Sequence, residues 1–519
     1  MLRCRHALSA LVGGVALLAT ACEKSVEPTP APAAPGISEG SIVAKAICDP
    51  LTSVCSAWEG FAQGFPAHVA IHMHLLPTGE VLLWPGEEGP THGTKGYQFA
   101  FIWNPTTGAT RQVDNRRSDV FCSGHAFMPD GRLLVAGGHI ADGKGRRETN
   151  IFDPFKRSWT RAADMNAGRW YPTATTLANG DVLVSAGTDE NGNYNAVAQV
   201  FSASRGGGWR SLSGASRNLP YYPLMFLAPD GRVFDAGPQA QSAFLDPSGA
   251  GSWSDGPATV NRIYRDYGSA VMYAPGKILL VGGGGSDGSS DPGPTRTAET
   301  IDLTAGGSWQ STGNMSIGRR MANATVLPDG KVLITGGTSG YGFNNEGTPV
   351  KTAELWDPST GAFSVLPAQQ RTRMYHSTTL LLPDGRILSA GGGRCGSCTI
   401  NNLDAEIFDP PYLFDGAGNP ATRPVITSAP TQIGYGASFT IGTGNPSAIT
   451  RISLIRLPSV THAFDQNQRF VPITSFSAQG GNLSATAPTD RNIAPPGHYM
   501  LFILNAQGVP SVAKIVQLG

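Results

Sequence analysis

Side chains capable of redox chemistry recur at one position of a repeated turn motif. The motif is a Pro-Asp-Gly type of turn between two apolar runs, as in LLLPDGRILSAGG, and its seven turn glycines are Gly79, Gly131, Gly180, Gly231, Gly276, Gly330 and Gly385. Nine residues before them stand Ala70, Cys122, Tyr171, Tyr222, Tyr267, Met321 and His376. Imidazole and phenolate together favour copper(II) or iron(III), so a cluster of these side chains would suit a redox metal.

The repeat predicts the elements that would position these residues. The turns are spaced about 45 to 55 residues apart, which is typical of a kelch blade. Each turn joins two apolar strands, and a second strand pair carrying Trp or Phe follows after a variable loop. Abundant glycine (66) and proline (39) agree with an all-β protein. We therefore predict a seven-bladed kelch-type β-propeller over residues 53–418.

The last copy of the repeat lacks a clear outer strand. The segment SVCSAWEGFA, residues 53–62, precedes the first blade and has the pattern of such a strand, so we expect it to complete blade seven. Residues 419–519 carry short alternating strands between Gly, Pro and Asn turns and predict a C-terminal immunoglobulin-like β-sandwich. Because inner strands line the axis of a propeller, the matched residues would converge there. Tyr222 and Tyr267 are more simply channel fillers, whereas Tyr171 fits either role.

The N-terminus has the features of an export signal. Arg3 and Arg5 precede an apolar run over residues 7–18 that is too short to span a bilayer, and small residues lead to Cys22. This pattern resembles a bacterial lipobox. We predict a signal peptide of the lipoprotein type over residues 1–21, a flexible tether over residues 22–52 and lipid attachment at Cys22. Ordinary secretion is the alternative, and both place the protein outside the cytoplasm.

Export makes the cysteine count informative, because thiols in an oxidising compartment are expected in pairs. Cys48 with Cys55, and Cys395 with Cys398, are close enough in the sequence to form disulfides. Cys122 is left over, and such a cysteine is either buried and inert or committed to chemistry. The net charge is zero and only 15% of residues are charged, which argues against a nucleic-acid partner. His72 and His74 alternate on a strand, but their closeness alone is a weak indication of a metal site.

The motifs around these residues resemble those of the copper radical oxidases, the family of galactose oxidase and glyoxal oxidase. The resemblance runs from about Ser53 to Gly519 and rests on DVFCSG, GRWYPT, RMYHS and SVTHAF, which contain Cys122, Tyr171, Tyr375–His376 and His462. It implies one copper ion held by Tyr171, Tyr375, His376 and His462. It also implies a thioether between Cys122 and Tyr171 that carries a radical, with Tyr375 as the base. His462 would arrive on a loop of the terminal domain.

The resemblance implies an oxidase that converts a primary alcohol or an aldehyde, with O2, to an aldehyde or carboxylic acid and H2O2. It would work as a monomer and contact a membrane only through the lipid anchor. A non-catalytic kelch propeller that binds glycans or proteins at the cell surface is the alternative, but it gives no reason for these five residues to occur together. A mononuclear copper protein that forms no radical is a third hypothesis.

Two departures from the family pattern bear on the radical and on the substrate. Asp189 stands where the family has a tryptophan stacked over the radical tyrosine. Trp170 adjoins Tyr171, but neighbouring side chains on a strand point to opposite faces, so it need not replace that stack. The sugar-contacting arginine has no clear counterpart, and the candidate pocket residues are Phe121, Arg262 and Arg265. We expect a glyoxal-oxidase-like aldehyde or a small primary alcohol, not galactose, as substrate.

Overall fold

The computed structural model describes residues 46–49, 54–86, 98–202, 206–284 and 293–519. All of them belong to one compact unit. The predicted signal peptide, Cys22 and most of the tether therefore lie outside the described residues. Within the described part, no helix is long and apolar enough to cross a membrane.

Seven antiparallel sheets form the propeller blades, and in blades one to six the propeller's own strands follow the order of the sequence from the inner strand outward. The first three blades contain β3 (His72–Leu75), β4 (Val81–Trp84), β5 (Phe101–Trp103) and β6 (Thr110–Gln112); β7 (Gly124–Phe127), β8 (Leu133–Ala136), β11 (Thr149–Asp153) and β12 (Ser158–Arg161); and β13 (Thr173–Thr176), β14 (Val182–Ser185), β15 (Val197–Ser202) and β16 (Gly208–Ser216). A small hairpin, β9 (His139–Ala141) and β10 (Lys144–Gly145), extends from blade two.

The next three blades repeat this order with different strand lengths. They contain β17 (Met225–Leu227), β18 (Val233–Asp235), β19 (Gln241–Asp246) and β20 (Ser252–Ala258); β21 (Ser269–Ala274), β22 (Lys277–Val281), β23 (Ala298–Asp302) and β24 (Gln310–Ser311); and β25 (Asn323–Val326), β26 (Val332–Thr335), β27 (Thr352–Asp357) and β28 (Ala362–Ala368). Short 3₁₀ turns lie at η2 (Leu303–Ala305), η3 (Pro411–Leu413) and η4 (Pro446–Ala448).

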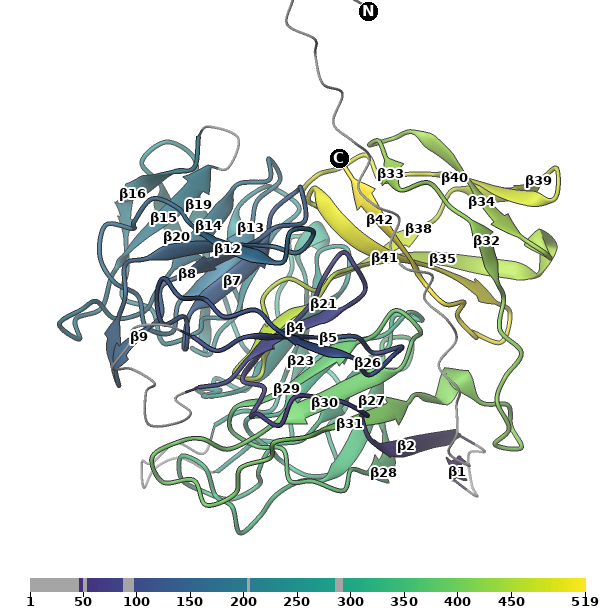
Figure 1. Ribbon diagram of the computed structural model, residues 1–519, viewed down its shortest axis with the longest axis horizontal. Helices are drawn as coiled ribbons and strands as arrows, with labels where there is room; N and C mark the ends of the chain where they lie inside the picture. Colours follow the sequence, from purple (N-terminus) through teal and green to yellow (C-terminus); the bar gives the residue numbers. More distant parts are fainter. Residues whose placement is uncertain (1–45, 50–53, 87–97, 203–205, 285–292) are drawn as a thin grey trace, which may run out of the picture. The chain divides into compact units, whose positions relative to one another are not determined.

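Blade seven closes the ring with a strand from the N-terminal side. β29 (Ser377–Leu381), β30 (Ile387–Gly391) and β31 (Ala405–Asp409) are joined by β2 (Cys55–Phe61), as the sequence predicted, and Figure 1 shows the purple β2 beside this green sheet. β1 (Ile47–Cys48) pairs with β2, and a 2.03 Å S–S bond joins Cys48 to Cys55. The predicted flexible tether over residues 22–52 must therefore be corrected at its end, because this pairing and disulfide hold Ile47–Cys48 in the sheet.

The C-terminal domain is a β-sandwich of two sheets, drawn in light green and yellow in Figure 1. One sheet contains β32 (Ile426–Ser428), β34 (Ser438–Thr443), β40 (Asn482–Thr486) and β39 (Phe476–Gln479); the other contains β33 (Gln432–Ile433), β42 (Lys514–Leu518), β41 (Gly497–Asn505), β35 (Ile449–Arg456) and β38 (Phe470–Ile473). Their inner faces share a core that includes Ile441, Leu454, Leu501 and Ile503. The predicted fold class is thus confirmed, while the boundary at residues 418/419 stays a prediction.

One hairpin of the C-terminal domain joins the sheet of blade one. β36 (Ser459–Thr461) pairs with β3 of blade one, with Thr461 opposite His72, and β37 (Phe464–Asp465) completes the hairpin. His462 lies in the turn between the two strands. The terminal domain therefore delivers a histidine to the inner strands of the propeller.

Candidate metal centre

The residues counted nine positions before the turn glycines share a rare backbone conformation. Six of the seven have a positive φ, between 44° and 66°, and Ala70 of blade one is the exception: they are Cys122, Tyr171, Tyr222, Tyr267, Met321 and His376. Main-chain hydrogen bonds link several of them from blade to blade, from the Tyr171 amide to the Cys122 carbonyl (2.9 Å) and from the Tyr222 amide to the Tyr171 carbonyl (2.9 Å). The equivalence deduced from spacing is therefore a structural equivalence around the axis.

Four side chains predicted as copper ligands meet at this level. The Tyr171 hydroxyl is hydrogen-bonded to the Tyr375 hydroxyl and lies 3.0 Å from His462 Nε2. The rings of His376 and His462 are perpendicular, with centroids 4.6 Å apart. All four residues are at most 5% exposed. The site thus draws on blade three, blade seven and the inserted hairpin.

Both histidines present the same nitrogen to the centre, because their other nitrogen has a fixed partner. His376 Nδ1 lies 2.7 Å from the Gly393 carbonyl, which can only accept, so Nδ1 carries the proton. The Thr461 hydroxyl donates to the Ile71 carbonyl (3.0 Å) and accepts from His462 Nδ1 (2.6 Å). Burial lowers the pKa of His376 to about 3 and that of His462 well below 6.5, so both rings are neutral. Each Nε2 therefore has a free lone pair, the form that binds metals.

These groups fit a copper ion. His376 Nε2 is buried without a hydrogen-bond partner among the described residues. Burial raises the pKa of Tyr171 and of Tyr375 well above 10, so the phenolate forms require a nearby cation. Two imidazole nitrogens and two phenol oxygens are a donor set suited to Cu(II). Among the described residues, no group of three or more His, Cys, Asp or Glu could hold a metal, which also removes His72 and His74 as the core of another site.

Cys122 lies beside Tyr171 in a small buried cluster with Phe121 and Tyr222. Among the described residues it is the cysteine that lies outside a disulfide, and it is 1% exposed. The tyrosine ring therefore has a thiol of the neighbouring blade against it. Tyr222 donates from its hydroxyl to the Ser123 carbonyl (3.0 Å) and packs against both Tyr171 and His462, with ring centroids 4.6 Å and 4.7 Å away.

Trp170 stacks directly on Tyr171, which corrects the expectation drawn from strand alternation. The ring centroids are 3.8 Å apart and the planes differ by 18°. The alternation rule does not apply because Tyr171 precedes β13 and has a φ of +64°, so the chain turns between the two residues. Asp189 instead accepts hydrogen bonds from the amides of Asn191 and Asn193 in its own turn. A tryptophan covers the tyrosine after all, from the adjacent position in the sequence.

A cavity of about 110 Å³ adjoins the centre on the side of blades four and five. Tyrosines dominate its lining, namely Tyr171, Tyr194, Tyr221, Tyr222, Tyr264 and Tyr267. The charged groups at its wall are engaged elsewhere: Arg265 pairs with Glu299 at 2.8 Å, with both side chains 0% exposed, and Asp266 pairs with Arg320. Arg262 is exposed and Phe121 packs near His376, with ring centroids 5.7 Å apart; neither lines this cavity.

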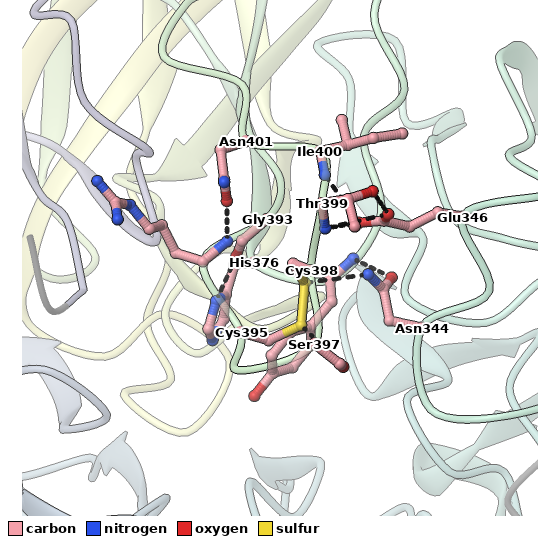
Figure 2. Close-up of a disulfide and its surroundings, with 12 residues drawn as sticks. Asn344, Glu346, His376, Gly393, Cys395, Ser397, Cys398, Thr399, Ile400 and Asn401 are labelled. Carbon is pink, nitrogen blue, oxygen red and sulfur yellow. Dashed lines mark hydrogen bonds between the residues drawn. A yellow bond between two sulfur atoms is a disulfide. The ribbon is translucent and has the colours of Figure 1, made fainter.

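A disulfide loop supports His376 (Figure 2). Cys395 and Cys398 are joined at 2.00 Å, two residues after the Gly393 carbonyl that orients the histidine. Asn344 of the neighbouring blade donates to Cys398 Sγ (3.2 Å) and accepts from the Tyr375 amide (3.4 Å). The ligand pair Tyr375–His376 is thus fixed from both sides.

Sequence reasoning missed the groups that orient the ligands. Thr461 adjoins His462 in the sequence, and a hydroxyl beside a candidate ligand was a usable signal. Gly393 acts through its carbonyl, which no residue type reveals. Tyr194 and Tyr221 gave no signal either, because their loops place them at the cavity.

Fold and site together define a β-propeller protein in which two imidazoles and two phenols converge, a donor set that fits one metal ion. Two family models match the chain: glyoxal oxidase N-terminus over residues 100–412 and galactose oxidase-like, early set domain over residues 423–518. The chain belongs to the copper radical oxidase family of galactose oxidase and glyoxal oxidase.

Individual relatives agree with this assignment. A galactose oxidase from Gibberella zeae is 36% identical over 482 residues, which cover 87% of this chain and 69% of that protein. The aldehyde oxidase GLOX of Vitis pseudoreticulata is 31% identical over 489 residues, covering 86% and 90%. The solved structure of a fungal alcohol oxidase of the AA5 family, in complex with copper, has a TM-score of 0.81 at 30% identity and covers 89% of this chain and 99% of that one.

Proposed function

We propose that the protein oxidises uncharged primary alcohols or aldehydes with O2, giving aldehydes or carboxylic acids and H2O2. The convergence of the Tyr171 hydroxyl, the Tyr375 hydroxyl and the two Nε2 atoms of His376 and His462 carries the proposal. A binding propeller, the alternative function, would not need two oriented imidazoles beside two buried phenols.

The four residues Tyr171, Tyr375, His376 and His462 would hold the copper. When bound, copper supplies a one-electron acceptor and the positive charge that buried phenolates require. Tyr375 Oη would take the hydroxyl proton of the substrate. Tyr171, joined to Cys122 by a thioether, would hold the radical and take a hydrogen atom from the substrate carbon. The overall reaction removes two electrons and two protons from the substrate, and O2 receives them to become H2O2.

The cavity supports an uncharged substrate. Its tyrosine rings offer flat apolar faces with hydroxyl tips, and the ion pairs of Arg265 and of Asp266 leave no free charge at the wall among the described residues. We therefore expect primary alcohols or aldehydes with an apolar or aromatic body to be better substrates than sugars or carboxylates. A small cavity of about 110 Å³ also disfavours large polyols.

Peroxide release and peptide mass test the proposal. Copper-loaded protein in air should lose two hydrogens in a peptide that joins Cys122 to Tyr171, and should release H2O2 with uncharged alcohols or aldehydes. Tyr171→Phe is the control for both readouts. A Cys122 that stays fully alkylatable after copper loading in air would falsify the radical mechanism. Peroxide release in that same sample would instead favour a copper oxidase without the radical.

Export, lipid attachment at Cys22 and a monomeric state complete the proposal. The two disulfides support export, because such bonds persist in oxidising compartments. Cys22→Ser should move the protein from the membrane fraction to the soluble exported fraction. An unchanged distribution would exclude the lipid anchor.

A further inference from the structure

Three buried histidines next to the metal centre take no part in the proposed reaction. His72 on β3 and His125 on β7 are joined through Nδ1 and Nε2 at 3.1 Å, and His125 Nδ1 lies 2.6 Å from the Ser459 hydroxyl on the inserted hairpin. His74 Nδ1 lies 2.9 Å from the same hydroxyl. All four residues are 0% exposed. These hydrogen bonds join blade one, blade two and the C-terminal domain.

This series of hydrogen bonds begins at the main-chain amide of Cys122. The Cys122 amide donates to His72 Nε2 at 3.1 Å. An amide can only donate, so His72 carries its proton on Nδ1 and donates to His125 Nε2. His125 then donates from Nδ1 to Ser459, and Ser459 can donate to His74 Nδ1. The Cys122 amide thus fixes the direction of the hydrogen bonds from His72 to His125 and from His125 to Ser459, and both rings are neutral in this arrangement. The Ser459 hydroxyl also lies 3.5 Å from the His125 carbonyl, a second acceptor for its hydrogen.

The acceptor of the Cys122 amide differs from the acceptor used by its counterparts in three other blades. At Tyr171, Tyr222 and Met321, the amide donates to the carbonyl of the matched residue in the preceding blade, each time at 2.9 Å. For Cys122 the matched residue is Ala70, whose carbonyl accepts from the Thr378 hydroxyl at 2.8 Å. Cys122 has a φ of +60°, a conformation that side chains other than glycine adopt only when their surroundings hold it. The imidazole of His72 therefore stands where blades three, four and six use a carbonyl.

We propose that His72 is a positioning residue that places the Cys122 thiol against Tyr171 for thioether formation. This inference rests on the proposed function, because the thioether belongs to it. In that step the Cys122 S–H bond and one ring C–H bond of Tyr171 break, and a C–S bond forms. Two protons and two electrons leave and reduce O2 to H2O2. The step needs the sulfur at the ring, and misplacement of a reacting group by about 1 Å can cost on the order of a hundredfold in rate.

The chain offers a matched control in His74. It lies two residues from His72 on the same strand, it is equally buried, and both rings stack on Trp84, with centroid distances of 4.9 Å for His72 and 4.5 Å for His74. Its hydrogen bond goes to Ser459, not to Cys122. Changes at His74 should therefore disturb the packing as much as changes at His72, but they leave the hydrogen bond from the Cys122 amide to His72 in place.

The test follows thioether formation after Cu²⁺ is added in air to the full copper-free protein. Intact mass and peptide mapping report the two-hydrogen loss, and alkylation reports free Cys122. We expect His72→Leu to slow formation roughly ten- to a hundredfold. His72→Gln, whose amide oxygen can replace Nε2, should stay within a few-fold of wild type, and His74→Leu should match wild type. Thermal unfolding and Cu²⁺ titration of each variant report general damage.

Two results would overturn the inference alone: a wild-type rate in His72→Leu, or equal slowing in His72→Leu and His74→Leu. If His72→Leu does not fold, His72→Asn takes its place, because its shorter amide falls short of the Cys122 amide. Equal rates for His72→Asn and His72→Gln would then overturn it. Absence of the thioether in the wild-type protein would overturn both this inference and the proposed radical.

Discussion

Blades three and seven each contain a pair of consecutive stacked rings with the same geometry, but the two pairs have different roles. Trp170 on Tyr171 and Tyr375 on His376 both have centroids 3.8 Å apart, with interplanar angles of 18° and 27°. In both pairs the second residue has a positive φ, 64° for Tyr171 and 66° for His376. A left-handed residue at the entrance of the inner strand turns two consecutive side chains to one side. In these two blades the left-handed residue thus brings two consecutive rings into a stack, and residue type decides the chemistry of the pair.

The difference lies in the first member of each pair. Tyr375 reaches the Tyr171 hydroxyl with its own hydroxyl, so both members of the blade-seven pair belong to the centre. Trp170 donates from Nε1 to His139 Nδ1 at 3.2 Å and stays outside it. One pair therefore contributes two of the proposed ligands, whereas the other contributes one proposed ligand and the ring that covers it.

The largest expected effect comes from making the blade-seven pair resemble the blade-three pair. Tyr375→Phe keeps the ring stacked on His376 but removes the base, so kcat should fall by about 10²–10⁴. Phe343→Leu is the matched packing control, because Phe343 packs edge-on against Tyr375 with centroids 4.5 Å apart, and it should retain most activity. Peroxide release, normalised to bound copper, measures both. Equal losses would show that Tyr375 acts through packing alone.

Each pair is preceded in the sequence by a buried arginine, Arg169 or Arg373. Replacing these two arginines should lower the free energy of unfolding by different amounts. Arg373 pairs with Asp404 and Glu406 at 2.9 and 3.1 Å, and Glu406 is 0% exposed. Arg169 bonds main-chain carbonyls and forms no ion pair within the described part of the chain, and burial lowers its pKa to about 9. Arg373→Met should cost about 3–5 kcal/mol, because it strands a buried carboxylate. Arg169→Met should cost about 1–3 kcal/mol for unsatisfied carbonyls.

Urea unfolding of copper-free protein at pH 7 measures both free energies. A larger loss for Arg169→Met than for Arg373→Met would contradict the assignment of the buried charge. Arg132→Met is a suitable control, since its ion pair with Asp130 is partly exposed and should contribute little.

Removing the disulfide should loosen blade seven without affecting blade three. Cys395→Ser with Cys398→Ser leaves the Gly393 carbonyl in the chain but frees the loop that holds it near His376 Nδ1. Copper affinity should fall about tenfold, at the lower limit for loss of a group that orients a ligand. Competition with a chelator measures the affinity, and Cys48→Ser with Cys55→Ser is the control remote from the centre. An unchanged affinity would mean that Asn344 and Gly393 suffice.

The spacing of the turns was enough to predict the fold and the level at which the chemistry lies. Counting back from the turn glycines identified Cys122, Tyr171 and His376 because six of the seven blades enter their inner strand with a left-handed residue at the same position. The count could not place His462, whose position depends on a hairpin that pairs with β3 across the domain boundary. That residue came only from the family resemblance.

The directions of individual side chains could not be predicted from the sequence. Alternation along a strand predicts opposite faces for Trp170 and Tyr171, but the rule requires extended φ at both residues, and Tyr171 is left-handed. Arg265 does line the cavity, but its ion pair with Glu299, more than thirty residues later, could not be foreseen, and its role as a substrate contact stays a prediction. Both cases concern side-chain direction and pairing, which depend on backbone angles and distant partners and not on composition.

The smallest expected effect tests whether Trp170 protects the proposed radical on Tyr171. Trp170→Leu removes the stacked ring, and a stacked aromatic pair contributes about 0.5–1.5 kcal/mol, which corresponds to a roughly two- to tenfold change. The lifetime of the oxidised form, followed by its absorbance, should shorten by that factor, while copper affinity stays unchanged. Trp170→Phe retains a ring, so the lifetime of its oxidised form should lie between those of the wild type and of Trp170→Leu. A wild-type lifetime in Trp170→Leu would leave the stack as packing only, and blades three and seven would then share a geometry but not a function.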